Sequence, residues 1–227
     1  MVRAHAAAQR LNVTNLGAAI VSEIRVRWEW RAFDPPHKAA RDALARADEP
    51  PGPPVTSDEV YVLSRLSPHN VKIRGGQLDV KMLEATRASG LELWRPTLKA
   101  RFPVTPAELA PVWHAWAITP PHRLAESYTL DRLLREIVDA IPTLLAISVV
   151  KHRTRLTLAG CAGEHARIEI AGRELTTIAF EDEDPERVLH TVHAAGLDAL
   201  PTSSYPAALK AVLGLARPLT PSPRVSV

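Results

Sequence analysis

Strict alternation of apolar and ionisable residues in the segment 23–33, EIRVRWEWRAF, constrains the fold more than any other feature of this sequence. One face of the predicted strand carries Ile24, Val26, Trp28, Trp30 and Ala32. The other face carries Glu23, Arg25, Arg27, Glu29 and Arg31. Successive side chains of a strand point to opposite sides, so each set occupies its own side of a sheet. The charged side is either exposed to water or enclosed within a barrel.

The same alternation recurs in later strand-like runs, and it distinguishes these two arrangements. The charged residues that share one face within their run are Lys72 and Arg74, Asp79 and Lys81, Lys99 and Arg101, Lys151, Arg153 and Arg155, Arg167 and Glu169, and Glu181 and Glu183. Cations dominate the central runs, whereas acids concentrate in the first and last. A water-exposed face normally mixes both signs, because like charges repel across strands. The pattern therefore favours a closed barrel around an anionic ligand, with carboxylates that suit Mg²⁺ or Mn²⁺.

The order of the predicted elements indicates an α+β fold: an antiparallel, eight-stranded, tunnel-like β-barrel with helices packed outside it. The strand-like runs form two groups, separated by the helical stretches TPAELAPVWHAWAI and TLDRLLREIVDAI. LELWRP and TLKARFPV are predicted as separate runs, and AGCAG, which contains Cys161, as a turn. Two capped helices, DPERVLHTVHAAG and SSYPAALKAVLG, close the series. We expect a flexible lead-in over residues 1–20, one domain over 21–215 and a disordered tail over 216–227.

Composition excludes several other classes of protein. The formal net charge of the 227 residues is only +3, which is too small to indicate nucleic-acid binding from bulk charge. An open basic sheet that binds RNA would interleave aromatic residues with its cations, whereas Trp28 and Trp30 lie on the opposite face. No apolar run has the length of a membrane span, and we expect no secretion signal at the N-terminus, with export by another route left open. The single cysteine indicates a reducing, cytoplasmic location. We therefore expect no nucleic-acid or membrane partner, and a homodimer remains an open alternative.

The series of strands resembles the CYTH-like triphosphate tunnel metalloenzymes. These proteins open with an E-x-E-x-K strand, continue with paired basic strands and a K-x-R strand, and end with an acidic strand of E-x-E type. RWEWRAF is similar to the first of these, VKIR and LDVK to the paired basic strands, KHR to K-x-R, and AFEDEDPERV to the last acidic strand with its helix. SYPAALK is similar to the closing helix. The resemblance covers about residues 20 to 215 in the order of the family.

The resemblance implies metal-dependent hydrolysis of a triphosphate-containing substrate, such as inorganic, nucleoside or thiamine triphosphate. On this basis Lys151 and Glu181 are the expected catalytic residues. The substrate-binding residues that the motifs imply are Arg31, Lys72, Arg74, Lys81 and Arg153. The alternation of side chains along the strands adds five further expected substrate-binding residues: Arg25, Arg27, Lys99, Arg101 and Arg155. The expected ligands of Mg²⁺ or Mn²⁺ are Glu29, Glu169, Glu181 and Glu183.

Two departures from the family pattern keep other functions open. Arg27 stands where the family has its first acidic residue, and Arg31 stands where it has lysine. Replacement of a metal-binding carboxylate by a cation weakens metal binding. A non-catalytic module that binds polyphosphate or a nucleotide in the same tunnel is therefore one alternative. Cyclase or polyphosphate-polymerase chemistry, also known in this broad family, is another.

Overall fold

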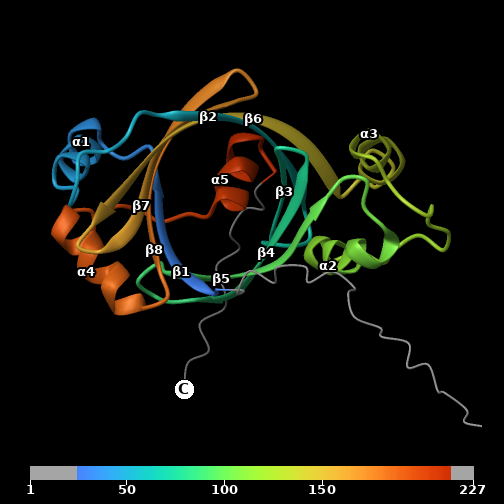
Figure 1. Ribbon diagram of the computed structural model, residues 1–227, viewed down its shortest axis with the longest axis horizontal. Coiled ribbons are helices and arrows are strands. Elements are labelled where there is room, and N and C mark those ends of the chain that lie inside the picture. The colour runs from blue at the N-terminus through green and yellow to red at the C-terminus, as the bar shows by residue number, and fades with distance from the viewer. Residues whose placement is uncertain (1–24, 216–227) are drawn as a thin grey trace, which may run out of the picture.

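The computed structural model describes residues 25–215, in which eight antiparallel strands close into a barrel in the order β1-β5-β4-β3-β2-β6-β7-β8 (Figure 1). The strands are β1 (Arg27–Phe33), β2 (Val55–Ser64), β3 (Asn70–Arg74), β4 (Gln77–Thr86), β5 (Glu92–Arg101), β6 (Leu144–Leu158), β7 (Cys161–Ile170) and β8 (Arg173–Asp182). The helices are α1 (His37–Ala45), α2 (Pro106–Trp116), α3 (Leu130–Leu133), the π-helix η1 (Leu134–Val138), α4 (Pro185–Ala195) and α5 (Tyr205–Val212). The α+β barrel predicted from the sequence is confirmed. The expected lead-in, residue Glu23 and the expected tail lie outside the described residues.

Local sequence signals explain several of the connections. β3 and β4 form a hairpin in which Arg74 pairs with Gln77 across Gly75 and Gly76. Both glycines have positive φ, 55° and 70°, a conformation that this two-residue turn requires and that only glycine adopts without strain. Asp184 caps α4 by accepting a hydrogen bond from the Glu186 backbone N–H, and Gly196 ends the helix with a φ of 71°. Both residues lie at the ends of the predicted capped helix DPERVLHTVHAAG.

Two details of the strands differ from expectation. The predicted runs LELWRP and TLKARFPV form one continuous strand, β5, although Pro96 lies inside it. The ladder between β4 and β5 shifts register between Val80 and Lys81, so that Val80 pairs with Leu98 and Lys81 with Pro96. A bulge of this kind accommodates a proline that lacks a backbone donor. Cys161 begins β7 rather than lying in a turn, because the turn is completed by Ala159 and Gly160, which both have positive φ.

The outward face of the barrel packs beneath helices on two sides (Figure 1). On one side Trp30, only 2% exposed, packs in a cluster with Val188 and Val192 of α4 and Ala43 of α1. On the other side α2 and the segment α3–η1 cover a second cluster, which includes Val71 and Ile73 of β3. The apolar side of the first strand is therefore buried outside the barrel. None of the helices within residues 25–215 is long and apolar enough to cross a membrane.

Helix α5 differs from the others because it lies within the ring of strands (Figure 1). Its residues Tyr205 and Leu209 pack in an apolar cluster with strand residues Tyr61, Leu63, Val149, Ile168 and Ile170. The backbone N–H of Ser203, just before α5, donates to the carbonyl of Arg31 at 3.0 Å. Lys210 Nζ donates to the carbonyl of Ser67 at 2.6 Å. These contacts fix α5 at one end of the barrel and place Tyr205 beside β1.

Candidate functional site

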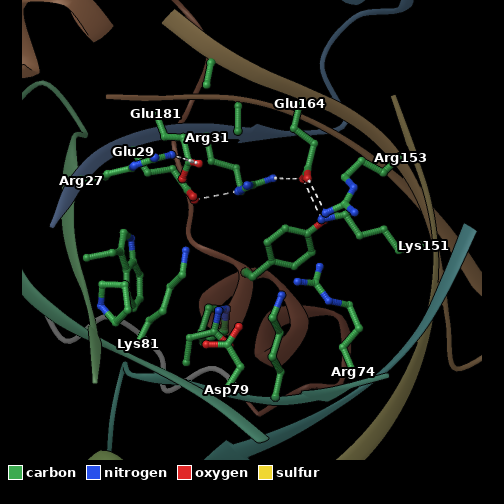
Figure 2. Close-up of a pocket in the computed structure, with 18 of the residues that line it drawn as sticks. Arg27, Glu29, Arg31, Arg74, Asp79, Lys81, Lys151, Arg153, Glu164 and Glu181 are labelled. Atoms are coloured by element: carbon green, nitrogen blue, oxygen red, sulfur yellow. Dashed lines mark hydrogen bonds and ion pairs between the residues drawn. The ribbon is translucent and has the colours of Figure 1, made fainter. Parts of the chain in front are cut away.

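The inward faces of the strands line a cavity of about 830 Å³ that is dominated by cations. Ten of the lining residues are cationic: Arg25, Arg27, Arg31, Lys72, Arg74, Lys81, Lys99, Lys151, Arg153 and Arg155. Four are acidic: Glu29, Asp79, Glu164 and Glu181. Figure 2 shows side chains from opposite walls, including Arg31 and Glu164 on one and Asp79 and Lys81 on the other, directed into the same space. The structure thus brings together nine of the ten expected substrate-binding residues, together with Lys151, Glu29 and Glu181.

Three of the expected site residues do not line this cavity. Arg101 is exposed at the end of β5. Glu183 follows the last residue of β8, and its Oε1 lies 3.3 Å from Arg25 Nη1 with 57% of the side chain exposed. Glu169 accepts hydrogen bonds from Arg167 Nη1 at 2.9 Å and pairs with His152 at 3.2 Å, both outside the cavity.

The placement of Glu169 corrects the assumption that the charged face of every strand points inward. On β7 the inward residues are Ile168 and Ile170, which pack against α5. An inserted helix needs an apolar surface to bury its own apolar side, so the charged residues at this end of β7 face outward. The charge pattern of the strand alone could not reveal which face α5 covers.

Glu164 of β7 is a central residue of the site that the sequence interpretation missed. Its Oε1 accepts from Lys151 Nζ at 2.7 Å and from Arg31 Nη1 at 3.4 Å, and its Oε2 lies 3.7 Å from Arg153 Nη1 (Figure 2). Its inward neighbours on the strand are Ala162 and Ala166, which give no polar alternation that would mark the face. The signal was therefore absent from the local sequence.

Electrostatics within this cluster are strong because it is buried. Burial alone would raise the pKa of Glu164, but the neighbouring Lys151 and Arg31 outweigh it and hold this pKa at about 2. Burial lowers the pKa of Lys151 to about 8, against the opposing pull of Glu164. Glu164 is thus ionised at neutral pH, where Lys151 is still mostly protonated.

A row of three carboxylates crosses adjacent strands on another part of the wall. Glu29 pairs in register with Glu181 of β8 and with Glu92 of β5. Arg27 Nη1 donates to Glu181 Oε1 at 2.8 Å, and Arg31 Nε donates to Glu29 Oε1 at 2.8 Å. Burial, reinforced by the charge of Glu29, raises the pKa of Glu92 to about 7. Glu92 was not among the expected residues, and its Oε2 accepts from Trp94 Nε1 at 3.2 Å.

A further buried acid, Glu59 of β2, holds the cations of β3. Its carboxylate lies 3.3 Å from Lys72 Nζ and 3.4 Å from Arg74 Nη1, and it accepts a hydrogen bond from Tyr61 Oη at 3.0 Å. Burial opposes ionisation of Glu59, but Lys72 and Lys151 lower its pKa below the usual range. Each acidic patch of the inner wall thus neutralises part of a larger cationic surface.

Polar atoms that lack a partner gather in this cavity. Within residues 25–215, five buried side-chain nitrogen or oxygen atoms have no hydrogen-bond partner in the protein. Four of them belong to lining residues: Asn70 Oδ1, Asp79 Oδ1, Arg153 Nε and Tyr205 Oη. A buried polar group without a partner costs about 1–3 kcal/mol, so such atoms are typical of a site that a ligand completes.

The inner wall offers carboxylates that fit a divalent cation carried with phosphate. Within the described part of the chain, no three acidic, histidine or cysteine side chains are grouped closely enough to enclose a metal ion by themselves. Glu29 and Glu181, however, are paired neighbours on the inner face, beside the cations of the cavity lining. Mg²⁺ typically binds one or two carboxylates together with substrate phosphates and water, and this pair meets that need.

Comparisons with known proteins found similarity at the level of structure. No protein-family model matches the sequence, and no curated protein is similar to it at a significant level. A proposed adenylyl cyclase from Hippeastrum, described as revealing a dominant triphosphatase activity, is 12% identical with a TM-score of 0.49; the match covers 82% of this chain and 96% of that one. A proposed adenylate cyclase from Bacillus halodurans is 14% identical with a TM-score of 0.44, covering 78% and 93%. A conserved hypothetical protein from Pyrococcus furiosus is 14% identical with a TM-score of 0.44, covering 79% and 98%.

The architecture of the described residues agrees with the resemblance carried by the sequence motifs. Eight antiparallel strands close completely, and the basic strand motifs line one internal tunnel. The outward faces of the same strands are apolar and covered by helices. The chain thus folds as a closed eight-stranded antiparallel barrel with a cation-lined interior, which agrees with the resemblance of its motifs to the CYTH-like triphosphate tunnel metalloenzymes.

Proposed function

We propose that this protein binds a triphosphate-containing substrate in the tunnel and hydrolyses one of its phosphoric anhydride bonds with Mg²⁺ or Mn²⁺. Inorganic triphosphate, a nucleoside triphosphate and thiamine triphosphate are the candidate substrates. The observation that carries the proposal is the convergence of ten arginine and lysine side chains on one cavity, against four lining carboxylates. Such an excess of cations around one cavity suits a ligand with several negative charges.

The proposed chemistry is electrostatic. Arg31, Lys151 and Arg153 surround Glu164 at the inner part of the tunnel and have further N–H donors for phosphate oxygens. Lys72 and Arg74 of β3 and Lys81 of β4 line the same cavity. Cations fixed on both sides of a phosphate chain neutralise the charge that develops as the anhydride bond breaks.

Glu29 and Glu181 would hold the divalent ion together with the phosphate oxygens. When bound, this ion neutralises phosphate charge and activates a water molecule. Arg27 and Arg31 orient the two carboxylates through the hydrogen bonds described above, and both arginines retain donors for the substrate.

Phosphate release from each candidate substrate, measured with Mg²⁺ and with Mn²⁺, tests this proposal. We expect turnover that depends on the metal and that falls at least about tenfold in Glu181→Gln, because a lost metal ligand removes charge stabilisation. Lys151→Ala should also lose activity while remaining folded. Glu183→Gln is the matched control, because Glu183 lies two residues after Glu181 but does not line the cavity. The activity of this variant should differ from that of the wild type by less than about twofold. Equal losses in both glutamate variants would contradict the proposed site.

A second candidate function, binding of triphosphate without turnover, is favoured by one contact. Arg27 Nη1 donates a hydrogen bond to Glu181 Oε1 at 2.8 Å and thus competes with a metal ion for this carboxylate. In this case triphosphate binds tightly, no metal supports phosphate release, and Glu181→Gln changes affinity little. Arg27→Glu then removes this competing cation, adds a carboxylate beside Glu29 and Glu181, and is expected to create metal-dependent activity. Analysis of the products of ATP separates hydrolysis from the cyclase and polymerase alternatives.

A further inference from the structure

We propose that His69 is a pH-sensitive anchor for the start of β3. In its neutral form the imidazole ties the β2–β3 loop, residues 65–69, to the backbone of β4. When protonated, it releases this loop and loosens the part of the tunnel wall that begins at Asn70. The inference goes beyond the proposed function. It is carried by a hydrogen bond from a backbone donor, by the neighbours of the ring, and by the contacts of the loop.

The hydrogen bond of His69 replaces a missing strand partner. β3 begins at Asn70, which pairs with Lys81 of β4. Leu83 lies two residues further along β4, past the start of β3, and its backbone N–H donates to His69 Nδ1 at 2.9 Å. A backbone N–H can only donate, so Nδ1 accepts and the ring is neutral. A protonated imidazole has a donor at both nitrogens, and two donors would then face each other.

The surroundings of the ring also oppose a positive charge. His114 of α2 stacks against His69 at a centroid distance of 6.5 Å, and Lys210 of α5 approaches the same loop. β4 faces the ring with the backbone N–H of Leu83. Among residues 25–215, no carboxylate is found among the charges that act on this ring. Burial, followed by the neighbouring His114 and Lys210, lowers the pKa of His69 below its ordinary value.

The β2–β3 loop is a junction between several elements. Ser67 Oγ accepts a hydrogen bond from the backbone N–H of His69 at 3.1 Å, and the Ser67 carbonyl accepts from Lys210 Nζ of α5 at 2.6 Å. Just before the loop, Ser64 Oγ donates to the carbonyl of Trp116, the last residue of α2, at 2.6 Å. Loss of the bond to β4 therefore loosens a segment that also contacts α2 and α5.

The same loop leads directly into the tunnel wall. Asn70 follows His69, lines the cavity and pairs with Lys81, another lining residue. Asn70 Oδ1 is buried and has no hydrogen-bond partner within residues 25–215, so the backbone at the start of β3 determines its position. We expect protonation of His69 to fray this first pair of the β3–β4 ladder. The share of molecules whose tunnel wall is in place then falls.

Thermal unfolding of wild type and His69→Asn at pH 7.5 and pH 5 tests the anchor without any ligand. The amide oxygen of asparagine can accept the Leu83 N–H as Nδ1 does, but it does not titrate. Because the pKa of His69 is lowered in the folded protein, its contribution to stability is complete above about pH 6.5 and is lost as the pH falls through the folded-state pKa. We expect the Tm of wild type to fall at least about 2 °C further than that of His69→Asn. Equal falls would overturn the proposal.

Two controls restrict the result to His69. His122→Asn replaces an exposed histidine, and its Tm should fall as that of wild type does. Glu92, with a pKa of about 7, titrates alike in all three proteins, so its effect cancels.

Amide hydrogen exchange locates the opening. The protection factor of the Leu83 N–H should fall at least about fivefold between pH 7.5 and pH 5 in wild type, but not in His69→Asn. An unchanged protection factor in wild type would contradict release of the anchor.

The consequence for the tunnel rests on the proposed function and has its own readout. Calorimetry should give equal affinities of wild type and His69→Asn for inorganic triphosphate at pH 7.5. At pH 5 wild type should bind at least about threefold more weakly than the variant. Protonation of triphosphate itself affects both proteins equally. Equal affinities at pH 5 would contradict the link between His69 and the tunnel wall. Absence of binding in both proteins at pH 7.5 would contradict the proposed function, whereas the two measurements without ligand decide the anchor.

Discussion

Lys151 Nζ lies 2.7 Å from Glu164 Oε1, and the two residues come from adjacent strands whose inner faces meet deep in the tunnel. The same carboxylate also contacts Arg31 and Arg153. One buried acid therefore keeps three buried cations together without a ligand. This arrangement makes stability and ligand binding depend on each other.

Replacement of this acid should destabilise the free protein but increase its response to triphosphate. Glu164→Gln leaves three cations close together without their carboxylate, and loss of one member of a buried ion cluster typically costs about 3 kcal/mol. Triphosphate relieves the same repulsion, so its stabilising effect should be larger in the variant than in the wild type. Thermal unfolding with and without inorganic triphosphate measures both. Glu174→Gln, which removes an exposed partner of Arg167, is the control and should behave as wild type. An equal ligand-induced shift in Glu164→Gln and wild type would contradict the link.

Triphosphate binding should weaken as the pH rises above about 8. Burial lowers the pKa of Lys151 to about 8 in the free protein, so its positive charge is lost progressively above that value. A bound polyanion favours the charged form and raises this pKa, so binding at pH 8 to 9 should take up a proton. Calorimetry in two buffers of different ionisation heat measures this uptake. In Lys151→Arg the charge persists, and the decline in affinity between pH 7 and 9 should become smaller; the same decline in both proteins would assign it to another group.

Two arginines with the same alternation in the sequence should differ in their effect on binding. Arg153 lines the cavity with 14% of its side chain exposed, whereas Arg101 is exposed and outside the lining. We expect Arg153→Gln to weaken triphosphate about tenfold or more, because it removes a charge-assisted contact in a desolvated site. Arg101→Gln should change affinity less than about twofold, since an exposed charge is screened. Similar losses in both variants would indicate that the anion binds outside the tunnel.

Gly163 should tolerate no side chain, although it lies in the middle of a strand. A Cβ at this position would lie 2.8 Å from Phe180 Cε1 and 2.9 Å from Leu156 Cγ, both in the buried outer core. Gly163→Ala should therefore lower the free energy of unfolding by about 1–3 kcal/mol, as overpacking does. Gly52→Ala, where a Cβ would meet nothing within 4 Å, is the matched control. Urea unfolding measures both, and equal stability of the two variants would show that the outer core can expand at Gly163.

The sequence by itself determined the strands, their faces and most of the cationic lining. Arg31, Lys72 and Arg153 each lie in a run with strict alternation, and period-two geometry leaves such residues on one side of a sheet. The hairpin at Gly75 and Gly76 and the capped start of α4 were also predictable, because their signals lie within a few residues of one another.

Only the tertiary structure decided which side of β7 faces inward and which acids complete the site. Glu169 follows the charged alternation but faces outward, whereas Glu164, whose neighbours on the same face of β7 are Ala162 and Ala166, binds Lys151 inside the tunnel. The reason is that α5 enters the barrel and requires Ile168 and Ile170 on the inner face. Glu92 likewise meets Glu29 only because β1 and β5 pair when the barrel closes. Alternation is a local property of one strand, whereas the identity of the buried face depends on what a distant segment of the chain packs against it.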